Sequence, residues 1–259
     1  MIIGRYMKKI ISIIVVLALA LAAFLWFKPL KENKPLGDIL IVGTSADFPP
    51  FSFRASDDSI TGFDIDIIKE IAQRLSMKID LQDKPFSALL PQIELGQIHV
   101  IAAGMTPTAE RAKRVTFTKP YLSGNPLLIV TRAADAPIAG IDGLKGKELI
   151  VNTGYTSDFY LTPLPDIRLL RLPKVSDALT ALEQGKADAF VTASFTIDPY
   201  VKEGDVRFKT SRLTETDEQS ALGISKYLPA SFVQRVQDAL DAMQADGTLD
   251  ALKKKWKLV

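Results

Sequence analysis

Arg111 follows a run of residues, 106–108, that is typical of the start of a helix. Its guanidinium is permanently charged, and its planar fork of N–H donors matches the two oxygens of a carboxylate. Backbone N–H groups near Gly104 and the dipole of the helix end add donors for the same anion. Arg111 is therefore a candidate carboxylate ligand, although its neighbours Lys113 and Arg114 are also typical of a solvated helix face.

Other residue types that often carry catalysis lack partners in this sequence. Asp64 and Asp66 precede an apolar helical stripe, so we interpret them as an N-cap and a first-turn acid. His99 is the only histidine, and no second metal ligand or nucleophile accompanies it. Cysteine is absent, which excludes thiol catalysis and thiolate-bound metals, and residues 43–45 lack the spacing of a phosphate loop. We expect no catalytic group, metal or cofactor.

The elements that must position these residues alternate between strands and helices. Short apolar runs ending near glycine predict strands, and apolar residues spaced three and four apart predict helices. Such alternation indicates an α/β protein with mostly parallel sheets, whose ligands bind beyond the carboxyl ends of the strands. The predicted strands are 39–43, 78–81, 99–103, 127–131, 148–152, 167–172, 187–192 and 220–225, and the predicted helices are 61–75, 87–95, 110–114, one from 156, 175–184 and a pair within 229–256.

Composition and charge exclude several classes of protein. The chain is 47% apolar and 24% charged, which fits a folded protein and not a disordered one. Residues 1–37 carry six basic side chains and one acidic side chain, so residues 38–259 hold 26 basic and 29 acidic residues. A weakly acidic body offers no attraction to a polyanion, so we expect no nucleic-acid partner.

The first 27 residues have the pattern of an export signal. Three basic residues within 5–9 precede an apolar run at 10–27, which is long enough for a helix to cross a bilayer. We therefore expect either a cleaved signal peptide or a retained membrane anchor at 1–27, followed by a Lys- and Pro-rich linker at 28–37. Either outcome places the rest of the chain in the periplasm or on the outer face of the inner membrane.

Four blocks of sequence, in order, resemble the periplasmic solute-binding proteins for polar amino acids that serve ABC importers. The resemblance spans about residues 38–259, and its blocks are 42–51 (VGTSADFPPF), 62–67 (GFDIDI), 103–111 (AGMTPTAER) and 246–248 (DGT) with Lys255 and Trp256. It implies a two-lobed, type II periplasmic-binding-protein-like fold with a two-strand hinge. Lobe 1 would comprise 38–126 plus 222–259, lobe 2 would comprise 127–221, and the ligand would lie between them.

The resemblance also implies roles for individual residues. Arg111 and Thr156 would bind one carboxylate from the two lobes. Phe48 and Phe86 would form flat aromatic walls that bury aliphatic groups at about 0.8 kcal/mol per CH₂. The expected ligand-binding set is Ser45, Phe48, Phe86, Gly104, Met105, Thr106, Arg111, Asn152, Thr156 and Ala193.

The chain departs from the family at the partners of the ligand's ammonium group. Ala193 stands where relatives usually carry Asp or Glu, and Ser45 stands where many carry Asp. A buried ammonium without a counter-charge costs several kcal/mol. Either the ligand lacks an α-ammonium, or another residue replaces the missing acid, the candidates being Asp47, Asp217, Glu218 and Ser194.

The leading prediction is a monomeric binding protein of an ABC-type amino-acid importer that captures a polar or cationic amino acid of the arginine or glutamine class. Closure of two lobes on the ligand would let it dock on the importer's membrane subunits. The alternatives are an exported enzyme resembling the cyclohexadienyl dehydratases, a binder of a carboxylate solute without an α-ammonium, and a membrane-tethered sensor. The enzyme would need a cleft carboxylate as general acid, and Ala193 removes the obvious candidate.

Overall fold

The computed structural model describes residues 37–201 and 207–258, without the side chains of residues 214–217. The predicted signal or anchor at 1–27 and nearly all of the predicted linker lie outside the described residues. Within the described ranges, no helix has both the length and the apolar character needed to cross a membrane. Residues from Pro35 onward form one compact unit.

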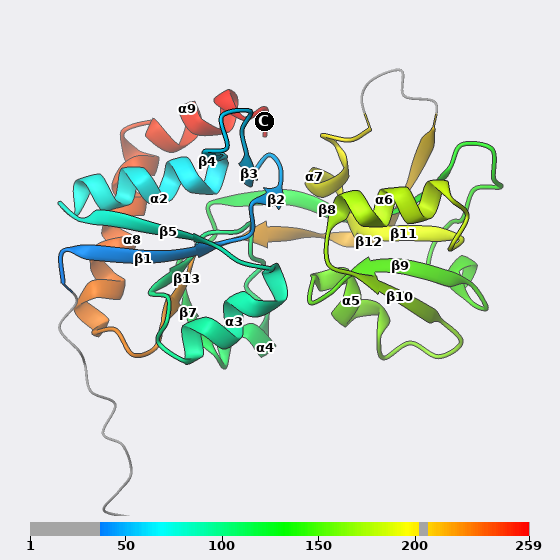
Figure 1. Ribbon diagram of the computed structural model, residues 1–259, viewed down its shortest axis with the longest axis horizontal. Helices are drawn as coiled ribbons and strands as arrows, with labels where there is room; N and C mark the ends of the chain where they lie inside the picture. Colours follow the sequence, from blue (N-terminus) through cyan, green and yellow to red (C-terminus); the bar gives the residue numbers. More distant parts are fainter. Residues whose placement is uncertain (1–36, 202–206, 259) are drawn as a thin grey trace, which may run out of the picture. The chain divides into compact units, whose positions relative to one another are not determined.

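Two mixed sheets flanked by helices make up this unit (Figure 1). The first sheet has the strand order β5-β1-β6-β13-β7. Within the described residues, four of its strands point the same way and β13 runs opposite to them, so the predicted mostly parallel arrangement is confirmed. Its strands are β1 (Ile39–Thr44), β5 (Lys78–Asp83), β6 (Val100–Ile101), β7 (Val115–Phe117) and β13 (Gly223–Ser225).

The second sheet repeats this plan with the order β10-β9-β11-β8-β12. Here β8 is the strand that runs opposite to the other four described strands. The reversed strand of the first sheet, β13, follows all five strands of the second sheet in the sequence, so the first sheet is built from two separate parts of the chain. The strands are β8 (Leu122–Arg132), β9 (Glu148–Asn152), β10 (Arg168–Leu172), β11 (Ala189–Ala193) and β12 (Phe208–Ser220).

Strands β8 and β12 connect the two sheets. They pair antiparallel along most of their length, from Phe208 opposite Arg132 to Ser220 opposite Leu122. Next to the Leu122–Ser220 pair, Tyr121 donates its backbone N–H to the Ser220 carbonyl. From there β8 is joined to β7, and β12 to β13, of the first sheet. The two crossing strands implied by the family resemblance are present.

Helices cover both sheets because their apolar stripes have no other place to avoid water. In α2, Ile67, Ile68 and Ile71 recur at helical spacing and are fully buried, as the sequence predicts. The helices on the first sheet are α2 (Phe63–Arg74), α3 (Phe86–Glu94), α4 (Ala109–Ala112), α8 (Ala230–Ala245) and α9 (Thr248–Lys255). Those on the second are η1 (Asp142–Leu144), α5 (Thr156–Leu161), α6 (Val175–Glu183) and α7 (Ser194–Ile197).

The acidic pair at the start of α2 acts only in part as predicted, because both residues, and not Asp66 alone, lie in the first turn of the helix. The N-cap of α2 is Gly62, so the interpretation of Asp64 as an N-cap is wrong. Asp64 lies in the first turn and is fully buried, whereas Asp66 accepts hydrogen bonds from Lys255 and from the Trp256 indole in α9. Asp66 therefore ties the end of the chain to α2, and Asp64 has an internal role described below.

A three-stranded sheet of β2 (Asp47–Phe48), β3 (Ser52–Arg54) and β4 (Ile60–Thr61) follows β1. It anchors Phe48, whose ring stacks on Phe51 with centroids 4.9 Å apart. Phe51 and Phe63 are fully buried in the core, as expected. The small sheet therefore fixes the segment that carries Phe48 beyond the carboxyl end of β1.

Candidate ligand-binding site

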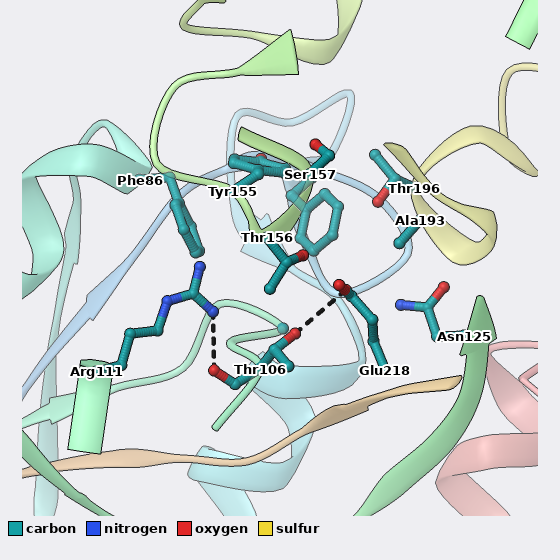
Figure 2. A pocket seen from close by; sticks show the side chains of 12 residues that line it. Phe86, Thr106, Arg111, Asn125, Tyr155, Thr156, Ser157, Ala193, Thr196 and Glu218 are labelled. Carbon is teal, nitrogen blue, oxygen red and sulfur yellow. Dashed lines mark hydrogen bonds between the residues drawn. The ribbon is translucent and has the colours of Figure 1, made fainter. Parts of the chain in front are cut away.

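A pocket lies at the carboxyl ends of strands from both sheets, where an open α/β sheet usually binds ligands. Figure 2 shows this inner pocket, whose volume of about 20 Å³ leaves room for about one water molecule. The described lining residues are Phe48, Phe86, Gly104, Thr106, Arg111, Asn125, Tyr155, Thr156, Ser157, Ala193, Thr196 and Glu218.

Arg111 reaches the pocket from the last turn of α4 and joins the two sheets. Its Nη1 donates to the Thr106 carbonyl at 2.8 Å, and its Nη2 donates to the Gly154 carbonyl, beyond β9, at 2.9 Å. Nε is buried without a hydrogen-bond partner, and the residue is 2% exposed. Burial lowers the pKa of Arg111 to about 10, so the side chain stays cationic at neutral pH. The solvated-helix interpretation is therefore wrong for Arg111, whereas Lys113 is exposed and pairs with Glu110.

Three aromatic rings form one wall of the inner pocket. The Tyr155 ring lies 5.6 Å from the Phe48 ring and 4.6 Å from the Phe86 ring, measured between centroids. The guanidinium carbon of Arg111 lies 5.5 Å from the Phe86 centroid, within range of a cation–π contact. An aliphatic chain entering the pocket would therefore meet aromatic surface beside a fixed positive charge.

Gly104 allows the loop after β6 to approach this wall. Its φ is +59°, and a Cβ at this position would stand 2.5 Å from Cε1 of Phe48. A larger residue would force the ring away from the pocket. The Gly104 N–H already donates to Asp64 Oδ2 at 2.6 Å, and the Tyr121 hydroxyl donates to the same oxygen at 2.7 Å. Asp64 therefore holds the loop that presents Thr106.

Glu218 brings a carboxylate into the pocket from β12. Thr106 Oγ1 donates to it at 3.3 Å, and Figure 2 shows the Asn125 amide facing it. Burial raises the pKa of Glu218, while a hydrogen bond from Thr156, the charge of Arg111 and the Thr106 hydroxyl partly oppose this shift. Figure 2 places the Glu218 carboxylate and the Arg111 guanidinium on either side of Thr106. The pocket thus presents opposite charges at two separate points.

The structure brings seven of the ten predicted site residues together in the pocket lining. These seven are Phe48, Phe86, Gly104, Thr106, Arg111, Thr156 and Ala193. The other three lie elsewhere: Met105 is in the hydrophobic core, Asn152 is buried with its amide donating to the Leu172 carbonyl at 3.2 Å, and Ser45 donates to Asp47 at 2.7 Å.

Sequence reasoning did not include Asn125, Tyr155, Ser157 or Thr196 in the site, and it gave Glu218 only as one of four candidates to replace the missing acid. Tyr155 and Ser157 flank Thr156 and follow the strand predicted at 148–152. Since ligands of such sheets bind beyond the carboxyl ends of strands, this position could have indicated both residues. Asn125 and Glu218 lie on the crossing strands, and their approach depends on pairing across almost a hundred residues. Of the other three replacement candidates, Asp47 lines a neighbouring cavity, Ser194 donates to Asn125 and the Asp217 side chain is not described.

Metal binding has no support in the described part of the chain, which contains no cluster of three or more potential His, Cys, Asp or Glu ligands. His99 uses Nδ1 to accept a hydrogen bond from the Ile41 backbone N–H at 3.1 Å. Its burial lowers its pKa, so the neutral imidazole that this bond requires is favoured. His99 is therefore part of the link between β1 and β6.

Asp64 gives a testable pH dependence of stability. Burial raises its pKa from 3.8 to about 6, so the folded protein holds this proton more tightly than the unfolded chain. The free energy of unfolding must then fall as the pH rises from about 4 to 6, by on the order of 3 kcal/mol from this group. In Asp64→Asn, an amide oxygen can keep both hydrogen bonds without the charge. Urea unfolding of both proteins at pH 4.5 and 7 measures the free energy of unfolding, and we expect the variant to lack the decrease seen in the wild type. If the free energy of unfolding changes equally with pH in both proteins, the change does not come from Asp64.

Comparison with known proteins agrees with this geometry. Residues 40–259 match the family described as bacterial extracellular solute-binding proteins, family 3. The chain belongs to this family. The resemblance in the four sequence blocks and the predicted two-lobed type II fold are both confirmed.

Curated relatives of this solute-binding protein include several binding proteins of ABC transporters. It is 29% identical over 222 residues to the arginine-binding extracellular protein ArtP of Bacillus subtilis, covering 84% of this chain and 85% of that protein. It is 26% identical over 254 residues to ABC transporter arginine-binding protein 1 of Escherichia coli, covering 96% of this chain and 99% of that protein. These curated relatives are binding proteins and not enzymes.

Solved structures show the same fold. An ancestral arginine-binding protein bound to arginine matches 85% of this solute-binding protein and 98% of its own chain, with a TM-score of 0.80 and 32% identity. A second solved structure is that of the ancestral amino acid-binding protein AncCDT-1, a precursor of cyclohexadienyl dehydratase. It matches 85% of this solute-binding protein and 95% of its own chain, with a TM-score of 0.75 and 31% identity. This structural neighbour is thus an amino acid-binding protein that preceded an enzyme.

Proposed function

We propose that this protein captures a polar or cationic α-amino acid, in the first instance of the arginine or glutamine class, and delivers it to an ABC importer. The observation that carries the proposal is the pair of opposite charges in one pocket beside an aromatic wall, from Arg111, which is buried, and Glu218, which is half-buried. An α-amino acid is the small solute that presents a carboxylate and an ammonium a few ångströms apart. The names of the arginine- and histidine-binding relatives support the same class.

Arg111 would bind the ligand carboxylate. Its buried Nε has no partner in the protein, so a carboxylate can supply the missing acceptor. The hydroxyl of Thr156, at the start of α5, lies in the same lining from the second sheet. One carboxylate bound by both residues would stabilise the closed arrangement of the two lobes.

Glu218 would bind the ligand ammonium in place of the acid missing at Ala193. Both residues line the pocket, so a carboxylate from β12 reaches the region that an acid at the end of β11 would occupy. Burial favours the neutral form of Glu218, and a bound ammonium would reverse that preference. With Glu218 as the counter-charge, the ligand can carry an α-ammonium even though no acid is present at residue 193.

The remaining predictions on organisation belong to the same proposal. The lobes would comprise 38–126 plus 222–259 and 127–221, with β8 and β12 as the hinge. Residues 1–27 would direct export and be cleaved or retained as an anchor. The protein would act as a monomer on the outer face of the membrane and dock on the importer's membrane subunits.

A thermal-shift screen of the purified protein against the common amino acids, followed by calorimetry, tests the proposal. We expect one-to-one binding of arginine or glutamine, with weaker binding of the same compounds lacking the α-amino group. The same samples are incubated with prephenate and arogenate as controls for catalysis. Turnover of either compound, or binding of no amino acid at all, would contradict the proposed function.

A further inference from the structure

A second, larger cavity adjoins the inner pocket. This outer cavity has a volume of about 280 Å³ and is formed by the loops after β1 and β5 of the first sheet and after β10 of the second. Its described lining residues are Ser45, Ala46, Asp47, Arg54, Asp83, Lys84, Pro85, Pro173 and Lys174. Its size and its many charged groups set it apart from the inner pocket.

The aromatic wall separates the two cavities. Asp47 and Pro85 line the outer cavity, while the next residue of each segment, Phe48 and Phe86, lines the inner pocket. Tyr155 packs against both rings from the other sheet. A ligand whose amino-acid head lies between Arg111 and Glu218 would therefore send its side chain past these rings into the outer cavity.

Part of the charge in the outer cavity is neutralised within the protein. Asp83 Oδ2 accepts from Arg54 Nη2 at 2.9 Å, and Asp83 Oδ1 accepts from the Ala46 N–H at 2.9 Å. Arg54 also pairs with Asp58 at 3.1 Å. These groups hold the cavity rim together and need no ligand.

Asp47 is a half-buried acid without an ion-pair partner among the described side chains. Its hydrogen-bond donor is Ser45 Oγ at 2.7 Å, and burial raises its pKa while the nearby charge of Lys174 lowers it. An ammonium group in the outer cavity beside Asp47 would give this carboxylate a counter-charge.

Lys84 and Lys174 supply the opposite charge. In the described part of the chain neither ammonium makes a hydrogen bond or an ion pair. They stand at the starts of α3 and α6, whose N-cap residues, Pro85 and Lys174, provide no side-chain acceptor for the free N–H groups of the first turn. This edge of the cavity therefore favours an anion. A side chain ending in a cation alone would leave both lysines unpaired and would be repelled by them.

We propose that the outer cavity binds a second amino-acid head, with its ammonium at Asp47 and its carboxylate at Lys84 and Lys174. The preferred ligand then carries an α-amino acid group at each end, joined by a short aliphatic or thioether bridge that passes the aromatic wall. This inference rests on the proposed function, because the first head occupies the inner pocket.

Calorimetry of the purified protein with a matched ligand series tests the inference. L-lanthionine and the longer L-cystathionine carry two heads, S-(2-aminoethyl)-L-cysteine lacks the distal carboxylate and S-(2-carboxyethyl)-L-cysteine lacks the distal ammonium. We expect a two-headed compound to bind at least about tenfold more tightly than either truncated compound and than arginine. If arginine or the aminoethyl compound binds as tightly as both two-headed compounds, the second head has no site and the inference is wrong.

Variants localise the effect. The double substitution Lys84→Ala and Lys174→Ala should weaken the two-headed ligands about tenfold, whereas the aminoethyl compound, whose distal ammonium the lysines repel, should bind at least as tightly as it does to the wild type. Lys69→Ala removes one positive charge from the exposed face of α2, outside the linings of both cavities, and should change nothing. Equal losses for the two-headed and aminoethyl compounds would contradict a carboxylate site at the lysines. Binding of none of these compounds, nor of arginine or glutamine, would instead reject the proposed function.

Discussion

Replacing Glu218 by glutamine should weaken the binding of arginine or glutamine by about 3 kcal/mol, more than 100-fold in the dissociation constant. The substitution keeps the size of the side chain and its contact with Thr106, which lies 3.3 Å from the carboxylate, but removes the charge opposite Arg111. The ligand ammonium would then be buried without a counter-charge. Calorimetry on the wild type and the variant measures the loss.

Two comparisons make this prediction specific. The des-amino analogue of arginine should bind the variant at least as well as it binds the wild type, because the buried carboxylate that repels it is gone. Adding Ala193→Asp to the Glu218→Gln variant should restore part of the affinity for the amino acid, since residue 193 lines the same pocket. If an amino acid binds the Glu218→Gln variant as tightly as it binds the wild type, its ammonium does not lie at Glu218 and the prediction is wrong.

Replacing Arg111 by lysine should weaken amino-acid binding by about 1.5 to 3 kcal/mol, roughly 10- to 100-fold. An ammonium cannot bind Thr106 and Gly154, from the two sheets, and a ligand carboxylate in the geometry of the guanidinium fork. The melting temperature should also fall, because the Gly154 carbonyl loses its buried donor. Both quantities are measured on one preparation by calorimetry and thermal unfolding.

Arg114→Lys is the matched control for this variant. Arg114 lies three residues further along the chain, pairs with Glu94 and is outside the pocket lining. Its replacement should leave ligand affinity unchanged. If Arg111→Lys binds amino acids as well as Arg114→Lys does, Arg111 serves only to join the two sheets and the ligand carboxylate binds elsewhere.

Local patterns predicted most of the regular structure. The buried stripe of α2 and the break between α8 and α9 at Asp246 follow from helical periodicity and from a glycine with φ of +81° at residue 247. Strand β12 was not predicted, because the strand expected in this region, 220–225, includes only its last residue, Ser220. Among the described strands it lies at the edge of its sheet and pairs with β8 alone, so its sequence, FKTSRLTETDEQS, needs no continuous apolar run.

The parts of the site that the sequence did not predict depend on distant pairings. Asp64 has the sequence pattern of a helix N-cap, and its buried hydrogen bonds come from Gly104 and Tyr121, which are 40 and 57 residues away. Glu218 is one acid among several near the end of β12, and only the pairing with β8 selects which one faces the pocket. A periodicity within one segment carries no information about such contacts.

The position of β13 also constrains the order in which the chain folds. This strand, near the end of the sequence, lies between β6 and β7, which are made more than a hundred residues earlier. Until residue 225 has been synthesised, β7 has no neighbour in the first sheet and β6 has a free edge. An incomplete chain therefore cannot complete its first sheet, and the pairing of this one short strand must follow the synthesis of nearly the whole protein.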